Sequence, residues 1–365
     1  MSSPLLEVPG AVPAPDGHHD AGVPWHFGDP FAEQRTASRA AIVVDRSHRE
    51  VVAVPGDDRL DWLHALTTQH FNALGEAAGS EALVLDLQGR IQHHAVVANL
   101  DGCVWLDTEP GYADGLFGYL DSMRFWSKVE PRQASAELAV LSLLGPKADE
   151  ILAALDIALP IQPYAVRALP EGGFARRMPW PRTGSVDLLV PRAELTEWWR
   201  RLTDAGARPA GSWAYEALRV ESLRPRLGVD TDEKAIPNEV NWLGSAVHLD
   251  KGCYRGQETV AKVYNVGQPP RRLLLLHLDG SPEVYPEAGQ PVRRGERVVG
   301  RVGSVTQHHE LGPIALALIK RSVPVDAELH AGADDEVVQA AIDPDSVPEG
   351  HEGAGRVAAR NLRGA

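Results

Sequence analysis

The hydrophobic pattern of the chain changes at Gly267. Before it, segments with helical spacing, such as "DDRLDWLHALTTQHF", alternate with strand-like segments, such as "EALVLDLQGRIQHHAVV". After it, "PPRRLLLLHLDG", "GQPVRRGERVVGRVGSVTQ" and "GPIALALIKR" are short apolar runs broken by Gly and Pro. Short runs of that kind are typical of a small antiparallel barrel or sandwich. The sequence therefore predicts an α+β region followed by a small β-barrel.

The chain of 365 residues is too long for one average domain and suits two or three packed units. Residues 1–23 are rich in Pro, Gly, His and Asp without apolar periodicity, which predicts a disordered arm. We assign residues 24–267 to an α+β region of two subdomains and residues 268–340 to the barrel. Residues 341–365 again lack a packing pattern, so we expect a disordered tail.

The charge balance limits the partners of the protein. The chain has 36 Lys and Arg against 50 Asp and Glu, a formal net charge of -14. This excess argues against a general surface for nucleic acid or anionic membranes, so we expect no direct nucleic-acid partner. An anionic ligand would need a local basic pocket.

The sequence also indicates a compartment. Apolar runs such as Leu273 to Leu276 are far below the roughly 20 residues that cross a bilayer, so we expect no membrane span. The first residues lack the basic start and apolar core of a secretory signal. Two cysteines cannot build a disulfide framework, and we expect both to stay reduced in a cytoplasmic protein.

The stretch "KGCYRGQE" is the strongest candidate for chemistry. Its Cys253 precedes "GQETVAKVYNVG", which has helical spacing, so the thiol should lie just before a helix N-terminus. The positive end of that helix, together with Lys251 and Arg255, would favour a thiolate. Gly252 and Gly256 would let the backbone turn sharply and a ligand approach closely.

A lone cysteine has a second interpretation, because free cysteines are among the most buried residues and usually serve only packing. The charges and glycines around Cys253 weigh against that interpretation. For Cys103, in the strand-like "GCVWLD", we keep the interpretation of a buried packing residue.

Several segments together indicate a family. "KGCYRGQE" resembles the signature of the YgfZ-type folate-binding proteins, which are relatives of the aminomethyltransferase (T protein) of the glycine cleavage system. "DRSHREVVAVPGDDRLDWLHALTTQ", "LRVES", "GVDTDEKAIPNEVNW" and "GRVGSVTQ" are similar to further segments of that superfamily. The resemblance covers roughly residues 25 to 330. It implies an aminomethyltransferase-like fold of packed subdomains around a central folate cavity, followed by the barrel.

The resemblance also implies a tetrahydrofolate site. Glu221 corresponds to a glutamate that holds the pterin ring, and one carboxylate can accept two parallel hydrogen bonds from a pterin edge. Lys251 corresponds to a basic residue that meets the carboxylates of the folate tail. The alternatives are a solvated helix-end glutamate and a surface lysine. The complete predicted set has Cys253 and Lys251 as reactive groups and Glu221, Lys251, Leu106, Thr108, Tyr254 and Arg255 as folate contacts, although Leu106 and Thr108 are equally consistent with ordinary strand residues.

The chain departs from the aminomethyltransferases at one position. Those enzymes carry an aspartate in the turn that resembles "GRIQHHAVV", where this chain has His93 and His94. A neutral imidazole cannot supply the fixed negative charge of that aspartate, which puts aminomethyl transfer in doubt. Adjacent strand residues point to opposite faces, so the two histidines should not share a metal ion, and we predict no metal site. We interpret His18, His19, His308 and His309 as solvated side chains.

The leading hypothesis is a tetrahydrofolate-binding accessory protein that supports iron–sulfur enzymes, including ones that modify tRNA, with the Cys253 thiol at the folate site. Its partners would be a folate derivative and iron–sulfur enzymes, and we expect a monomer. The alternative is a folate-dependent transferase or demethylating enzyme in which His93 or His94 is the base. A binding module that has lost its folate affinity is the third possibility.

Overall fold

A computed structural model of the chain describes residues 2–266, 268–281, 284–333 and 336–348. The chain divides into two compact units. The first unit contains residues 1–65, 70–82 and 93–222, and the second contains residues 66–69, 83–92 and 223–365. The chain therefore passes between the units several times before residue 222, whereas the sequence pattern suggested a single boundary at Gly267.

A six-stranded sheet forms the centre of the first unit. Its strand order is β10-β11-β12-β9-β3-β13, and only the β13–β3 pair is parallel among these strands. All seven residues of β9 are buried, which fits a central strand covered on both faces. The bounds are Val166–Ala168 for β10, Phe174–Met178 for β11, Ser185–Pro191 for β12, Leu138–Leu144 for β9, Ile42–Asp45 for β3 and Arg208–Ala210 for β13.

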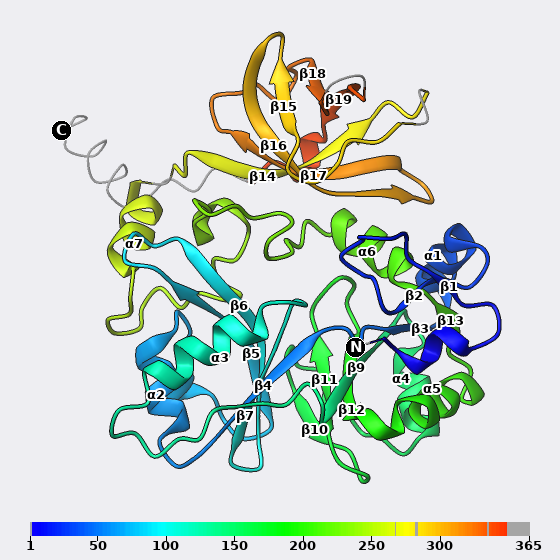
Figure 1. The fold of residues 1–365 in the computed structure, drawn as a ribbon, viewed down its shortest axis with the longest axis vertical. Helices are drawn as coiled ribbons and strands as arrows, with labels where there is room; N and C mark the ends of the chain where they lie inside the picture. Colours follow the sequence, from blue (N-terminus) through cyan, green and yellow to red (C-terminus); the bar gives the residue numbers. More distant parts are fainter. Residues whose placement is uncertain (1, 267, 282–283, 334–335, 349–365) are drawn as a thin grey trace. The chain divides into compact units, whose positions relative to one another are not determined.

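Helices cover both faces of this sheet (Figure 1). On one face α4 (Ala148–Ala154) and α5 (Leu195–Asp204) bury Ile151 and Trp198 against Leu141 and Leu188. On the other face α6 (Ser212–Glu221) packs through Leu218 against the alternate strand residues. Successive side chains of β3 therefore pack into two separate cores, one on each face of the sheet. Helix α1 (Pro30–Arg39) shares the second face, and η3 (Arg192–Glu194) leads into α5.

A five-stranded sheet has the order β5-β6-β7-β4-β8. Asp101 and Gly102 form the turn that joins β6 and β7, and both residues have the positive φ values of a tight hairpin. Val51 and Ala98 of this sheet pack against Val140 and Leu189 of the six-stranded one. The bounds are Ala78–Leu85 for β5, Ile91–Leu100 for β6, Cys103–Thr108 for β7, Glu50–Pro55 for β4 and Arg132–Gln133 for β8, and α2 (Arg59–Leu66), η2 (Phe71–Ala73) and α3 (Ala113–Ser122) lie between these strands in the chain.

The segment for which the sequence predicts a disordered arm, residues 1–23, is ordered from residue 2 onward. It forms η1 (Pro4–Glu7) and β1 (Val12–Pro13), which pairs with β2 (Pro24–His26). Leu5 is fully buried in the core of α4 and α5, and the Ser3 hydroxyl donates to Asp45 at 2.5 Å. One buried leucine and one buried hydrogen bond fix a segment whose composition alone favours disorder.

The C-terminal half of the second unit is a closed barrel with the order β14-β17-β16-β15-β18-β19, antiparallel throughout. Leu274, Leu276, Ala315 and Ile319 contribute to its core. Closure leaves no free sheet edge. The bounds are Arg271–Leu278 for β14, Pro291–Arg294 for β15, Arg297–His308 for β16, Gly312–Lys320 for β17, Leu329–Ala331 for β18 and Val338–Ile342 for β19, and η4 (Pro237–Glu239) and α7 (Gln257–Val266) precede them.

The barrel confirms the expected antiparallel C-terminal domain, but it ends slightly later than predicted. Its last strand reaches Ile342, and η5 (Pro344–Ser346) follows, so the first residues of the predicted disordered tail belong to ordered structure. The remainder of that prediction, residues 349–365, lies outside the described residues. In the part of the chain that is described, no helix has the length and apolar character needed to cross a membrane.

Candidate functional site

Lys251 fixes the loop of residues 250–256, which the sequence singles out. Its ammonium donates to the carbonyl oxygens of Thr67, at 2.6 Å, and Gln69, at 3.1 Å. Burial lowers the pKa of Lys251 to about 8, so the group is still mostly charged at neutral pH. The side chain is therefore no ordinary surface lysine, because it ties this loop to a segment 184 residues earlier in the chain.

Cys253 is exposed on that loop, as its proposed role at a site requires. Helix α7 begins at Gln257, four residues further on, so the thiol lies outside the first helical turn. Arg255 is also exposed. Tyr254, which stands between Cys253 and Arg255 in the sequence, is buried, and burial raises the pKa of its phenol to about 12. The Lys251 nitrogen lies 5.3 Å from the centre of the Tyr254 ring. Tyr254 therefore anchors the loop while the neighbouring thiol stays exposed.

The two glycines of the loop differ in what they do. Gly256 has φ +80°, and a Cβ there would lie 2.6 Å from the carbonyl oxygen of Asp86 and 2.7 Å from Cα of Gly89. Only glycine fits such a close approach of two backbones. A Cβ on Gly252 would meet nothing within 4 Å. The prediction of a required glycine is thus supported at Gly256 and has no steric basis at Gly252.

Cys103, the other cysteine, lies buried in β7. Burial raises the pKa of its thiol to about 11. This is the inert setting that the sequence suggests for it.

Leu106 and Thr108, also in β7, are both buried. The Thr108 hydroxyl donates to the carbonyl oxygen of His94 at 2.7 Å. That bond ties β7 to the part of β6 that holds the two histidines. Their predicted contact with folate stays a prediction.

His93 and His94 point to opposite faces of β6, as the strand geometry predicts. His93 packs beside α3, where a Cβ on Gly115 would lie 3.0 Å from its ring. Burial lowers the pKa of His93 to about 4, so the ring is neutral at physiological pH. His94 turns the other way, and its Nε2 lies 2.8 Å from Oε2 of Glu81. The two rings cannot ligate one ion.

Glu81 is the centre of a buried polar group that we name the Glu81 cluster: Glu81, His94, Tyr164 and Trp180. Glu81 is fully buried, and its Oε1 accepts hydrogen bonds from the Tyr164 hydroxyl and, at 3.1 Å, from the Trp180 indole. A buried carboxylate needs such donors to offset the loss of water. No pattern in the sequence predicts this cluster, because Glu81 stands at the start of an otherwise apolar strand segment and its donors come from distant segments.

Glu221 is the last residue of α6, and its Oε2 lies 3.0 Å from a guanidinium nitrogen of Arg182. About a third of each side chain is exposed, 35% for Glu221 and 31% for Arg182. The carboxylate is therefore accessible to a ligand, and Arg182 keeps it close to one position. A partly exposed acid beside a cation is suited to accepting hydrogen bonds from an aminopyrimidinone edge.

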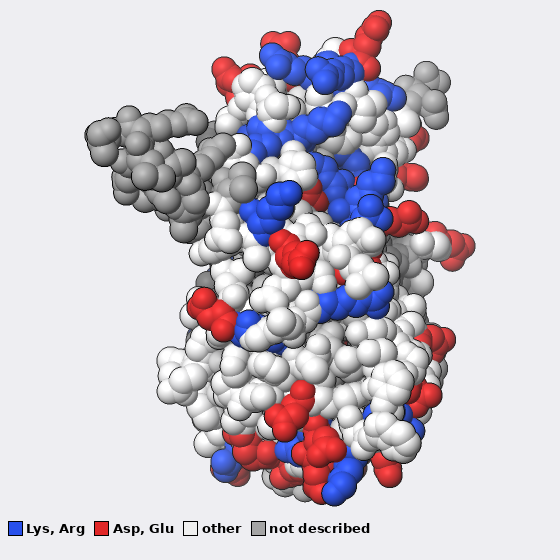
Figure 2. Space-filling view, turned by 90° about the vertical axis from the view of Figure 1, so that its left-hand side faces the viewer, with Lys and Arg blue, Asp and Glu red and all other residues white. Residues whose placement is uncertain are grey.

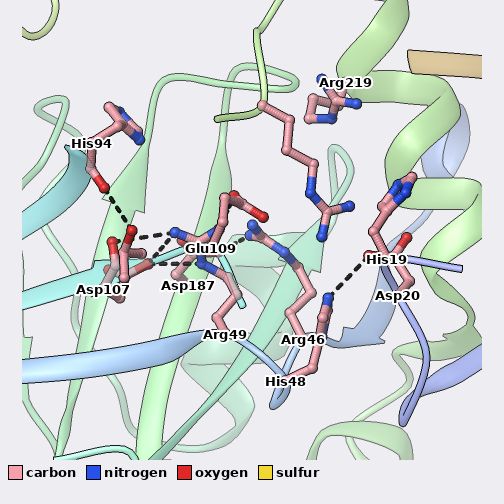
Figure 3. A network of polar contacts seen from close by, with 12 residues as sticks. His19, Asp20, Arg46, His48, Arg49, His94, Asp107, Glu109, Asp187 and Arg219 are labelled. Atoms are coloured by element: carbon pink, nitrogen blue, oxygen red, sulfur yellow. Dashed lines mark hydrogen bonds and ion pairs between the residues drawn. The ribbon is translucent and has the colours of Figure 1, made fainter. Parts of the chain in front are cut away.

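A buried charge network lies in the same unit (Figure 3). The Arg49 Nε donates to Asp107 at 2.9 Å, and Arg176 lies 2.7 Å from Asp107 and 3.2 Å from Asp187. Burial by itself would raise the pKa of Asp107, but Arg176 and Arg49 outweigh it and hold that pKa below its usual value. With Arg46 close to Asp187, the network pairs charges from five strands or strand ends and links the two sheets of this unit.

The expectation of solvated side chains is wrong for His308 and His309, whose side chains are buried. His18 and His19 keep exposed surface, but they lie in an ordered segment and their rings stack at 4.1 Å between centres. With Asp20 they place three possible metal ligands within 4.8 Å of one another. His18 Nδ1, however, accepts the Asp20 amide at 3.1 Å, and Asp20 bonds His48 at 3.0 Å (Figure 3). These hydrogen bonds already use one ring nitrogen of His18 and one carboxylate oxygen of Asp20, and we assign no metal to the group.

Comparison with known proteins fits the fold. The family described as the GCVT N-terminal domain matches residues 23–251, and the chain belongs to this family. It is 28% identical over 335 residues to an aminomethyltransferase from Symbiobacterium thermophilum, covering 87% of each chain. It is also 28% identical over 278 residues to "Putative transferase At1g60990, chloroplastic" from Arabidopsis thaliana, covering 73% of this chain but only 62% of that protein.

A solved structure confirms the fold. The crystal structure of the glycine cleavage system aminomethyltransferase T from Bartonella henselae superimposes with a TM-score of 0.81 at 17% sequence identity, covering 96% of both chains. The chain is thus an aminomethyltransferase-like member of the GCVT superfamily with an α+β body and a C-terminal barrel, as the sequence predicts.

Proposed function

We propose that the protein binds tetrahydrofolate and supports iron–sulfur enzymes, as its resemblance to the YgfZ-type proteins suggests. The observation that carries the proposal is the pairing of His94 with Glu81 at 2.8 Å. At the position that resembles the aspartate of the aminomethyltransferases, this chain presents an imidazole bonded to its own buried carboxylate. On this proposal, the site would still hold the vitamin, with an imidazole in place of the aspartate carboxylate.

The predicted ligand contacts fit a reduced folate in their chemistry. The accessible carboxylate of Glu221 would accept hydrogen bonds from the pterin edge, with Arg182 holding it close to one position. Lys251 and Arg255 would supply positive charge for the carboxylates of the tail, and Tyr254, Leu106 and Thr108 would form the surrounding wall. Bound folate would supply a one-carbon carrier or a reductant, and the exposed thiol of Cys253 is the reactive group that the resemblance implies.

Calorimetric titration with tetrahydrofolate tests the ligand. The wild type should bind, and Glu221→Ala should weaken binding at least tenfold because a charge-assisted hydrogen bond is lost. Glu197→Ala, which removes an exposed glutamate of α5, is the matched control and should bind like the wild type. No binding by the wild type, or equal affinity in Glu221→Ala, would remove the proposed pterin contact.

Genetic complementation tests the role of the thiol. In a strain that lacks the corresponding gene, the wild-type chain should restore the activity of iron–sulfur enzymes, and Cys253→Ala should not. Cys103→Ala is the control, because Cys103 is buried. Full restoration by Cys253→Ala would exclude the thiol from the function.

A second candidate function follows from the same pair of residues. A histidine oriented by a buried carboxylate is the usual arrangement of a general base, so a folate-dependent transferase or demethylating enzyme would use His94 for proton transfer. Turnover of a methylamine donor with tetrahydrofolate, abolished in His94→Gln, would favour the enzyme. Folate binding without turnover would favour the accessory protein.

A further inference from the structure

A cavity of about 310 Å³ lies within the second unit, where η4, α7 and the start of β14 meet. Its apolar wall includes Leu243, Val263 and the ring of Tyr264. Its polar lining includes the guanidinium groups of Arg272 and Arg321. This volume is at the small end of the range for ligand pockets, so it would hold a group about the size of one substituted ring.

Strand pairing brings the two arginines together. Strands β14 and β17 are antiparallel with Arg271 opposite Lys320, and the Arg321 amide donates to Pro270 at 3.0 Å. Among the residues that the structure describes, the Arg272 guanidinium donates one hydrogen bond, to the carbonyl oxygen of Val323 at 3.1 Å, and its buried Nε has no partner. Burial and the nearby charge of Arg321 lower the pKa of Arg272. The protein therefore holds two like charges close together in a partly desolvated place.

No free carboxylate in the described lining of the cavity neutralises Arg272 and Arg321. Glu239 is the one carboxylate among the described residues that line it. Both oxygens of Glu239 are bonded to Arg271, at 2.9 and 2.8 Å, and Arg271 also bonds Asp232. Because that glutamate already serves another arginine, Arg272 and Arg321 have no carboxylate of their own in the lining.

The surroundings add further positive charge. An adjoining depression shares Glu239, Pro269 and Arg321 with the cavity and adds Lys234 and Lys320. Figure 2 shows Lys and Arg side chains gathered over the barrel on the side of the molecule that it displays. In a chain with a net charge of -14, this is the kind of local basic pocket that an anionic ligand needs.

We propose that this cavity binds a small organic anion, whose carboxylate or phosphate pairs with Arg272 and Arg321 and whose apolar body packs on Leu243, Val263 and Tyr264. Guanidinium groups match the geometry of both anions through paired hydrogen bonds. The ligand relieves the repulsion between the two arginines, which is the energetic reason for the site. The site is independent of the proposed folate contacts, since it shares no residue with them.

Fluorine NMR of the full chain tests the site with 4-fluorobenzoate and its neutral counterpart 4-fluorobenzamide. We expect the benzoate signal to broaden on addition of protein and the benzamide signal to stay sharp. Competition with phenyl phosphate, with benzoate and with inorganic phosphate then shows whether the site prefers a phosphate or a carboxylate. Stronger displacement by phenyl phosphate than by benzoate assigns a phosphate ligand, and the reverse order assigns a carboxylate.

Variants locate the binding. Arg321→Gln should weaken 4-fluorobenzoate binding at least tenfold, because a charge-assisted pair is lost. Arg294→Gln, at an exposed arginine at the end of β15, should bind like the wild type. Arg272→Gln should also weaken binding, but it removes the bond to Val323, so its thermal midpoint is measured in parallel. Arg321→Gln decides the question if Arg272→Gln is unstable, since no hydrogen bond or ion pair joins the Arg321 guanidinium to a described residue.

Three results would overturn the proposal. Equal broadening of benzoate and benzamide would remove the role of charge. Unchanged binding in Arg321→Gln would place the ligand elsewhere. Displacement by inorganic phosphate as strong as by phenyl phosphate would show a site for an adventitious ion only, without a role for the apolar wall.

Discussion

The Nε2 atom of His94 lies 2.8 Å from Oε2 of Glu81, and both residues are buried. The pair joins neighbouring strands of the five-stranded sheet, and Tyr164 and Trp180 donate to the other carboxylate oxygen. One side chain thus satisfies donors from three separate segments. Its loss would remove an acceptor that all three of these segments contact.

We therefore expect Glu81→Ala to lower the free energy of unfolding by about 3–5 kcal/mol, the range for breaking one side of a buried charged pair. Urea denaturation followed by tryptophan fluorescence measures this. Glu150→Ala, an exposed glutamate in α4, should change stability by no more than about 0.5 kcal/mol. Similar small losses in both variants would mean that the Glu81 cluster contributes little to the fold.

His93 should make the protein sensitive to acid. Burial lowers its pKa from 6.5 to about 4, so between these values the unfolded chain binds a proton that the folded chain does not. Stability contributed by the neutral ring is complete above pH 6.5 and falls as the pH drops towards 4, by no more than about 3 kcal/mol. His93→Gln should show a flatter dependence over this range in urea unfolding series. A wild-type curve as flat as that of the variant would contradict the assignment.

The two thiols should react at very different rates. Cys253 is exposed and Cys103 is buried, with a thiol pKa of about 11. With 5,5′-dithiobis(2-nitrobenzoate) at pH 8, the folded protein should release one equivalent of thionitrobenzoate quickly, and the second only in denaturant. Cys253→Ala should abolish the fast phase, and Cys103→Ala should keep it. Fast reaction of the Cys253→Ala variant would show that Cys103 is accessible.

Gly256 and Gly252 form a matched pair for backbone geometry. Gly256→Ala forces a Cβ to 2.6 Å from the Asp86 carbonyl oxygen at φ +80°, so we expect a loss of stability of about 1–3 kcal/mol. Gly252→Ala meets no atom within 4 Å and should be nearly neutral. Differential scanning calorimetry compares the two directly. Equal midpoints for both variants would mean that the loop relaxes without cost.

The sequence predicted the fold well because its signals are local. The short runs after Gly267 have the period and punctuation of strands, and the Asp101-Gly102 turn carries the residues that a tight hairpin requires. The opposite orientations of His93 and His94 follow from the pleat alone. Each of these features depends on residues close together in the chain.

The remaining features depend on contacts that the sequence does not encode locally. The arm before residue 24 is ordered because Leu5 enters a core most of whose other members lie more than a hundred residues away. The Lys251 ammonium binds main-chain carbonyls, which carry no residue signature. Glu81 gave no signal, because a glutamate beside an apolar strand is more often solvated than buried. The sequence did not indicate the Arg272 and Arg321 cavity either, because its lining residues come from segments far apart in the chain.

The assignment of residues 66–69 and 83–92 to the second unit has a consequence for the history of the gene. A fragment that begins at residue 223 would encode the barrel, yet it would lack the two carbonyl oxygens that fasten the loop with the exposed thiol. Neither unit is encoded by one contiguous segment of the gene, so a single recombination event cannot transfer one unit alone to another protein. We expect both to have been inherited together, with variation concentrated at the termini.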